Sequence, residues 1–185
     1  GVRLVYSGSS QGWITATAGN DATVDTETFV TATGGNTVAT CGDYKIHTFT
    51  SDGNFVVSAT GNPAGSNSVE YLVVAGGAGG STGGGGAGGF RFASPSIAPA
   101  TYPAKPLAGP SNIPVTAQTY PIVVGAGGAD GSPTGSNCGS SGGNSSFSSI
   151  TSAGGGGGSK SGSPQNGVAG GSGGGAGADG SGATG

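Results

Sequence analysis

One stretch of the sequence, Val69 to Gly89 (VEYLVVAGGAGGSTGGGGAGG), limits the possible folds more than any other. Its first part, Val69 to Ala75, has the length and the β-branched and aromatic residues of a buried or half-buried strand. The chain then passes directly into almost pure glycine, which offers no side chains for a core. Within this stretch glycine recurs at every third position, at Gly77, Gly80, Gly83, Gly86 and Gly89.

A period of three fits neither an α-helix nor a β-strand, but it is the period of a polyproline-II-type helix, which has about three residues per turn. Such a helix has no internal hydrogen bonds, and ordering glycine costs more backbone entropy than ordering any other residue. Several glycine helices side by side can bond to one another, because without Cβ their backbones approach closely, as in collagen. The alternatives are a packed bundle and a flexible linker.

Recurrence favours the bundle. The strand-like segment Tyr120 to Val124 enters a second glycine stretch, GAGGADG, and Phe147 to Ser152 enters a third. If the glycine stretches were only flexible linkers, there would be no reason for three strand-like segments to continue directly into them. We therefore predict a mainly β fold in which a short antiparallel β module and β-sandwich-like strands feed a bundle of polyglycine-II helices. The predicted helices cover residues 76–89, 125–131, 154–158 and 167–185.

The composition divides the chain. Only 10 of the 45 glycines precede Ala75, whereas 8 of the 13 charged residues do. We predict a short N-terminal β module at 1–33 and a glycine-rich domain at 34–185. Two strands, Val2 to Tyr6 and Gly12 to Ala18, make up the module. In the second domain, Tyr44 to Thr50 and Asn54 to Ser58 are expected to form a hairpin, and the predicted strand regions are 44–58, 69–75, 120–124 and 147–152.

A proline-rich segment, Ala93 to Pro121, carries seven of the ten prolines, so an extended surface loop without regular strand or helix is expected there. The loop and its start are the part of the sequence best equipped for recognition, because glycine helices present little to bind with. Its aromatic faces suit stacking on saccharides, and they equally suit capping of the bundle or packing on a neighbouring subunit. The candidate receptor contacts are Phe90, Arg91, Phe92, Tyr102 and Lys105.

Charge and hydropathy exclude several classes of partner. Five Lys and Arg residues and a formal net charge of −3 give no electrostatic basis for binding nucleic acid or an anionic membrane. No stretch reaches the ~20 apolar residues that a membrane span needs. We expect neither a nucleic-acid partner nor membrane insertion.

Catalytic and metal motifs are weak. His47 is the only histidine, and no metal-ligand spacing surrounds it, so it is interpreted as a strand-face residue. The carboxylates of Asp21 to Glu27 indicate a solvated loop. Ile122 to Asp130 resembles a dinucleotide-binding turn but lacks the helix that this chemistry needs. A disulfide between Cys41 and Cys138 is not expected. We expect no enzyme activity, no catalytic residues, no cofactor and no metal.

A resemblance to a known family rests on several strings taken together: YKIHTFTSDGNFVVS, VEYLVVAGGAGG, GGGGAGGFRF, YPIVVGAGG and SSFSSITSAGGGGG. Over about Gly34 to Gly185 the chain resembles the glycine-rich domain of tailed-bacteriophage tail fibres and related virion appendage proteins, with marine and cyanobacterial phages especially similar. LVYSGSSQGWIT looks like the short β module that precedes this domain in such fibres. The long proline-rich segment departs from the family pattern.

The resemblance implies a structural fibre segment of the virion with a role in host-surface attachment, located in the tail or a capsid appendage. It implies a homotrimer that contacts other virion proteins and a host cell-surface glycan or outer-membrane protein through loops between polyglycine-II helices. One alternative is a capsid decoration or head-fibre protein. Others are a free-standing antifreeze-type polyglycine-II protein and an extracellular matrix protein, since animal receptor ectodomains also carry glycine-rich domains.

Overall fold

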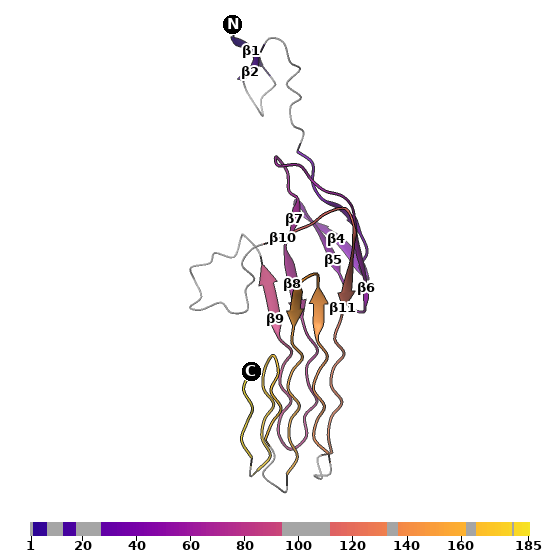
Figure 1. Cartoon of the computed structure of the whole chain (residues 1–185), viewed down its shortest axis with the longest axis vertical. Coiled ribbons are helices and arrows are strands. Elements are labelled where there is room, and N and C mark those ends of the chain that lie inside the picture. The colour runs from indigo at the N-terminus through magenta and orange to yellow at the C-terminus, as the bar shows by residue number, and fades with distance from the viewer. Residues whose placement is uncertain are drawn as a thin grey trace.

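The fold is mainly β, as predicted, with antiparallel sheets and no helix in the part of the chain that is described (Figure 1). It is a computed structural model that describes residues 2–6, 13–17, 27–93, 112–132, 137–161, 166–178 and 180–185. The strands are β1 (Val2–Tyr6), β2 (Trp13–Thr17), β3 (Thr31–Thr33), β4 (Thr37–Cys41), β5 (Tyr44–Thr48), β6 (Gly53–Ala59), β7 (Ser68–Val69), β8 (Tyr71–Val74), β9 (Phe90–Ala93), β10 (Ile113–Pro114), β11 (Thr119–Val123), β12 (Ser145–Phe147) and β13 (Ile150–Ser152).

A small side-chain core lies between a five-stranded sheet, ordered β13-β12-β11-β6-β3, and the pair β8-β9. Alternation along the strands selects the buried side chains: β6 buries Phe55 and Val57, and β8 buries Tyr71 and Val73. The Phe147 ring packs edge-on against Phe55, with ring centroids 6.0 Å apart. This core is confined to the strand end of the glycine-rich region.

The expected hairpin between Tyr44–Thr50 and Asn54–Ser58 is wrong. β5 pairs with β4, and β6 pairs with β3 and β11. The β4–β5 connection is the two-residue loop Gly42-Asp43, in which Gly42 has φ +57° at the first central position, as a type II′ hairpin turn requires. The chain after β5 does not turn into a hairpin with β6. It is fixed by Asn36, whose Oδ1 accepts a hydrogen bond from Thr50 N–H at 2.8 Å.

The expectation that the proline-rich segment excludes strands is also wrong at its C-terminal end. β10 pairs with β7 in a two-stranded sheet, and Pro114 lies in β10. Because β10 has no second neighbour among the described strands, pairing does not require the N–H that proline lacks. Pro121 opposes Asn54 of β6, and pairing with β12 begins only at Ile122. Val115 is buried, so this part of the segment belongs to the core.

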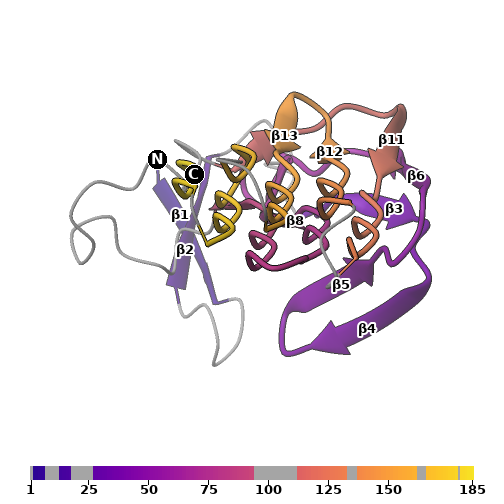
Figure 2. The same cartoon turned by 90° about the horizontal axis from the view of Figure 1, so that it is seen from below.

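The glycine-rich segments lie side by side below the strands and form a bundle (Figures 1 and 2). Each strand that enters or leaves the bundle does so without a linker; for example, β8 continues directly at Ala75. Turns divide two of the stretches for which polyglycine-II helices were predicted, 76–89 and 167–185, and 137–144 adds a segment that the sequence analysis missed. The segments are run 1 (75–80), run 2 (83–89), run 3 (124–131), run 4 (137–144), run 5 (153–159), run 6 (166–171), run 7 (172–177) and run 8 (181–185).

Run 5 is the centre of the bundle, and Gly154 to Ser159 are all buried. Its backbone bonds to five other runs, and the partner changes with a period of three. The N–H groups of Gly155 and Gly158 bond to run 1, whereas those of Gly156 and Ser159 bond to run 7. Its carbonyls divide in the same way among runs 2, 4 and 6. Each residue of run 5 therefore faces a neighbouring backbone.

Which glycines are crowded depends on the runs that lie beside them. Crowding does not recur at every third residue through 76–89. A Cβ at Gly76 or Gly79 would overlap the backbone of run 3, but a Cβ at Gly77 would lie 4.0 Å from its nearest neighbour. In run 5 a Cβ at any of Gly154 to Gly158 would overlap a backbone carbonyl. Five consecutive glycines are therefore needed where neighbours lie on all sides.

Candidate functional site

The receptor-contact candidates fall in two places. Phe90, Arg91 and Phe92 lie in strand β9, which pairs with β8, and not in a loop. The Phe90 and Phe92 rings pack together with centroids 5.5 Å apart. Tyr102 and Lys105 lie outside the described residues. The structure therefore gives no grouping of all five.

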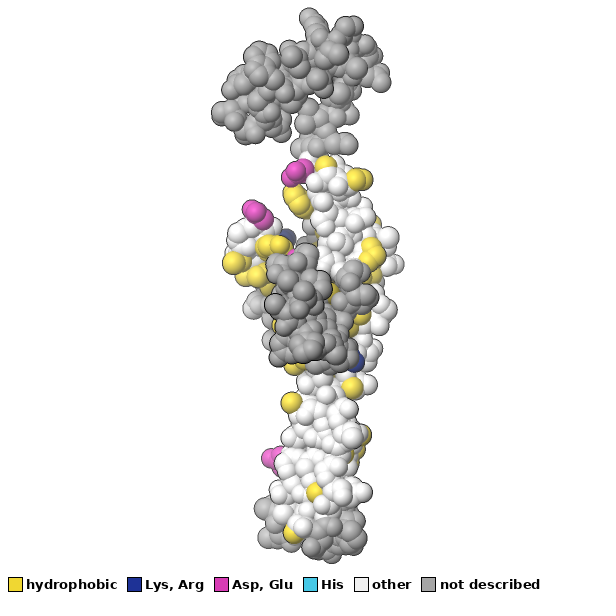
Figure 3. All heavy atoms as spheres, turned by 90° about the vertical axis from the view of Figure 1, so that its left-hand side faces the viewer, with side chains coloured by type: hydrophobic (Ala, Val, Ile, Leu, Met, Phe, Trp, Pro, Cys, Tyr) yellow, Lys and Arg dark blue, Asp and Glu magenta, His cyan; other side chains and the backbone are white. Residues whose placement is uncertain are grey.

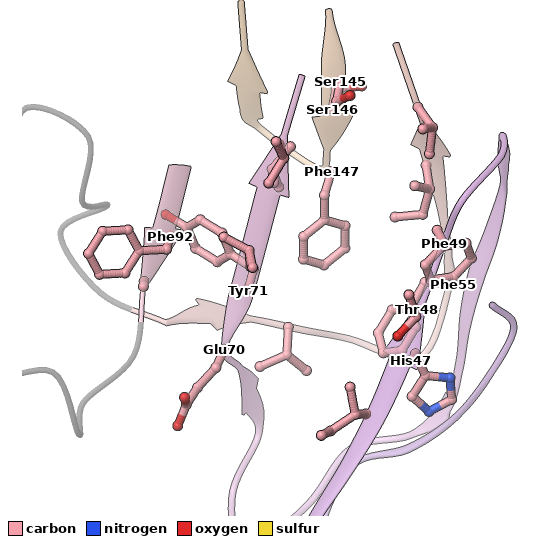
Figure 4. A pocket seen from close by; sticks show the side chains of 18 of the residues that line it. His47, Thr48, Phe49, Phe55, Glu70, Tyr71, Phe92, Ser145, Ser146 and Phe147 are labelled. Atoms are coloured by element: carbon pink, nitrogen blue, oxygen red, sulfur yellow. The ribbon is translucent and has the colours of Figure 1, made fainter. Parts of the chain in front are cut away.

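Phe90 and Phe92 contribute to an apolar hollow of about 890 Å³ between β5, β8, β9, β11 and β12 (Figure 4). Its volume lies within the range of small-molecule sites, ~300–1,000 Å³. Strand alternation explains the lining, because β8 turns Tyr71 and Val73 into the core and leaves Leu72 and Val74 exposed. The remaining exposed apolar side chains at the hollow are Tyr44, Ile46, Phe90 and Val123.

Of these exposed residues only Phe90 was among the candidates, although one signal pointed to those on β8. Tyr71-Leu72-Val73-Val74 is apolar on both faces of the strand, which is typical of a strand with two covered faces. Only one of these faces is covered by the core. An exposed apolar set of this kind marks an interaction surface.

Few polar groups reach the hollow. His47 is held by a 2.7 Å hydrogen bond between its Nδ1 and the Gly34 carbonyl, and its ring packs edge-on against Phe55 at 5.2 Å. The Glu70 carboxylate points away from the aromatic rings (Figure 4). The Tyr71 hydroxyl oxygen is buried and has no hydrogen-bond partner among the described residues. The arrangement suits contact with apolar surface.

Tyr120 is the one described residue with a clear pKa shift. Its hydroxyl accepts a hydrogen bond from Thr116 N–H at 2.8 Å and lies 3.4 Å from Thr116 Oγ1. Hydrogen bonds from the Thr116 side chain and backbone lower the pKa of Tyr120 because they favour the phenolate, while burial acts in the opposite direction. The hydroxyl faces its own loop, so the shift reflects a structural turn.

The described residues include neither a metal-binding cluster nor a helix that could cross a membrane. No group of three His, Cys, Asp or Glu side chains could hold a metal ion there. Cys41 is an exposed thiol, and Cys138 is a partly buried thiol in run 4. No described helix has the length and apolar character to cross a membrane.

The bundle presents a different surface from the strand region. Its visible face consists largely of backbone, glycine and small polar residues, with a few isolated apolar side chains, whereas apolar side chains gather over the strands above it (Figure 3). Asp130 lies near the end of run 3, and its Oδ1 accepts a 3.1 Å hydrogen bond from Gly80 N–H. The bundle surface therefore offers backbone groups and little side-chain chemistry.

Comparison with known proteins gives one positive result. A family model described as a glycine-rich domain matches residues 50–185, which include the bundle and all the strands from β6 onward. No curated protein and no solved structure matches the chain. Since the matched range covers most of the 185 residues, the chain belongs to the glycine-rich domain family.

Proposed function

We propose that the chain is a non-enzymatic structural fibre segment of a bacteriophage virion, a tail fibre or related appendage, that helps the particle to attach to its host. The observation that carries this proposal is the continuation of successive strands into backbone-bonded glycine runs. Such a bundle provides a stiff rod with little surface chemistry. That property suits a spacer between a particle and the surface that it meets.

The proposal includes polyglycine-II geometry for the runs. The hydrogen bonds support it because they recur every third residue: Gly83, Gly86 and Gly89 of run 2 donate to Ser159, Gly156 and Ala153 of run 5. Bonds in several directions around one run also distinguish it from a β-strand, which bonds only to its two sides. Measurement of backbone φ and ψ by NMR tests this part. Values near −75° and +145° are expected in runs 1 to 5, and extended β values contradict it.

The assembly is proposed to be a homotrimer, joined to other virion proteins at its ends. The exposed apolar side chains around the hollow support association, because a monomer gains nothing from leaving them in water. Light scattering on the folded chain tests it, with a mass of three times 17.0 kDa expected. A mass of 17.0 kDa at all concentrations contradicts the trimer.

Host contact is assigned to Phe90, Arg91, Phe92, Tyr102 and Lys105, with a cell-surface glycan or outer-membrane protein as the partner. The test uses the phage that encodes the chain. Antibody labelling of intact particles decides between the tail and the capsid, and labelling on the capsid favours the alternative of a decoration or head fibre. Phe92→Ala with Tyr102→Ala is expected to reduce adsorption, and unchanged adsorption contradicts the receptor role.

A further inference from the structure

Run 6 begins with an asparagine that is followed directly by a glycine, Asn166-Gly167, and this dipeptide occurs nowhere else in the sequence. The backbone nitrogen of a residue after asparagine can attack the side-chain amide carbon and close a five-membered imide ring. Glycine places no side chain in the way of that approach. The dipeptide therefore holds both partners of an intramolecular reaction.

Both reacting groups are hydrogen-bonded to the same residue of run 8, Ser181. The Ser181 N–H donates to Asn166 Oδ1 at 3.0 Å, and the Gly167 N–H donates to the Ser181 carbonyl at 3.0 Å. The amide to be attacked and the nitrogen that attacks it thus face one neighbour. Holding two reacting groups together in this way is itself a source of rate.

The two bonds favour the same reaction. A donor at Oδ1 stabilises the negative charge that develops on this oxygen when the amide carbon is attacked, as donors in an oxyanion hole do. The Ser181 carbonyl accepts the Gly167 N–H, whose proton must leave before the nitrogen can form a new bond. Asn166 is exposed, so water has access to the site.

Other asparagines lack part of this arrangement. Asn62 and Asn144 also accept backbone hydrogen bonds through Oδ1, from Thr28 N–H and Gly154 N–H. Asn62 is followed by a proline, which has no N–H to lose, and Asn144 by a serine, whose Cβ hinders the approach of its nitrogen. A polarised amide and an unhindered attacking nitrogen come together at Asn166.

We propose that Asn166 is a self-modification site at which the folded chain deamidates with the help of the Ser181 backbone. The Gly167 nitrogen loses its proton and bonds to Asn166 Cγ. The bond between Cγ and Nδ2 breaks, and Nδ2 takes up the proton and leaves as ammonia. Water then opens the ring. Opening at Cγ gives aspartate, and opening at the main-chain carbonyl gives isoaspartate, whose backbone is one methylene longer.

The modification changes how run 8 is held. Run 8 bonds to run 6 through the two Ser181 bonds, and to run 7 through Ala183 N–H and the Gly174 carbonyl. Aspartate keeps an acceptor for Ser181 N–H and adds a charge that strengthens the bond. In isoaspartate the longer backbone moves the acceptor away from its place beside Gly167 N–H. The isoaspartate fraction therefore loosens run 8 as the protein ages.

The test measures deamidation of the folded chain by mass spectrometry after incubation at neutral pH. Cleavage after Lys160 releases residues 161–185, in which Asn166 is the only asparagine. Ser181→Pro removes the N–H that bonds to Oδ1, and proline suits the backbone proposed for the runs. Ser181→Ala is the matched control, because it keeps both backbone bonds. We expect the alanine variant to react like the wild type and the proline variant to react about fivefold or more slowly.

A second comparison needs no variant. In urea the Ser181 bonds are absent, so the unfolded wild type is expected to deamidate more slowly than the folded chain under otherwise equal conditions. Isoaspartate among the products identifies the ring, since direct hydrolysis gives aspartate alone. A folded chain that reacts no faster than the unfolded one, a proline variant that reacts at the wild-type rate, or a product without isoaspartate overturns the proposal.

Discussion

The strand region and the glycine bundle are stabilised in different ways. The strand region is held by buried side chains such as Phe55, Tyr71 and Phe147, which gain free energy by leaving water. The bundle buries Gly154 to Gly158, whose only groups to satisfy are those of the backbone. The comparison shows that one chain can change its type of core within a single residue, as between Val74 and Ala75.

The two regions should also respond differently to substitutions that change the shape of a side chain. A side-chain core tolerates changes of shape at moderate cost, because neighbouring side chains adjust. A backbone core has no adjustable neighbours, because the atoms that a new Cβ meets are carbonyls fixed by hydrogen bonds. The following changes test this difference, from the largest expected effect to the smallest.

Gly155→Val is expected to have the largest effect. Its Cβ would overlap the Gly86 carbonyl, and Gly155 N–H bonds to the Gly76 carbonyl at 2.9 Å, so runs 1 and 2 would both be displaced. A loss of more than about 4 kcal/mol in the free energy of unfolding is expected. Urea unfolding measures it, with Gly127→Val as the matched open position. Equal losses in the two variants would contradict a backbone core.

Phe147→Ala tests the side-chain core. The ring contacts Phe55 and Tyr120, each with centroids 6.0 Å away, and it is almost fully buried. Loss of these contacts and the cavity left behind predict a destabilisation of about 3–5 kcal/mol. Phe147→Leu, which keeps much of the volume, should recover part of it. If both variants unfold like the wild type, the strand region is not the stabilising core.

Tyr71→Phe should stabilise the strand region. The buried Tyr71 hydroxyl has no partner among the described residues, so its removal ends a desolvation cost of about 1 kcal/mol or more. Tyr120→Phe is the matched control. It leaves Thr116 N–H without its hydroxyl acceptor and should destabilise by a similar amount. A loss of stability in Tyr71→Phe would show that the hydroxyl is hydrogen-bonded.

Gly84→Ala is expected to stabilise the monomer by about 0.4–1 kcal/mol, because it restricts the unfolded chain and meets nothing in the folded one. Thermal unfolding at high dilution measures the effect. Gly86→Ala, two residues further along the same run, should destabilise because its Cβ would overlap the Ser172 carbonyl. The opposite order would show that overlap of a Cβ with a neighbouring carbonyl does not decide which glycines are needed.

The smallest expected effect is a pH dependence at Tyr120. Its native pKa lies below the usual value of 10.0, so between the native and unfolded values the folded chain binds fewer protons. The free energy of unfolding should therefore rise with pH as pH passes through the native pKa toward about 10, and the gain should be absent at lower pH. The difference between wild type and Tyr120→Phe in urea unfolding from pH 7 to 10 isolates this contribution. A difference that shrinks with rising pH contradicts the sign.

The sequence predicted the mainly β fold because alternation and glycine content are local signals. Two turns compete as the hairpin connection of β5: Gly42-Asp43 before it and Ser51-Asp52-Gly53 after it. The sequence analysis chose the second, which paired β5 with β6, whereas β5 pairs with β4 through the first. Which glycines are crowded was not predictable, since Gly76 and Gly77 differ only in which run lies beside them. The exposed side of β8 was missed for the same reason: alternation identifies two faces but not which of them is covered.

Run 5 has a further consequence for heat capacity. Unfolding of the bundle exposes mainly peptide groups, and exposure of polar surface lowers the heat capacity, whereas exposure of apolar surface raises it. The buried glycines of run 5 therefore contribute little of the positive change that curves the stability of ordinary domains with temperature. The stability of a rod built in this way should therefore fall almost linearly as the temperature rises, without the decline at low temperature that leads to cold denaturation.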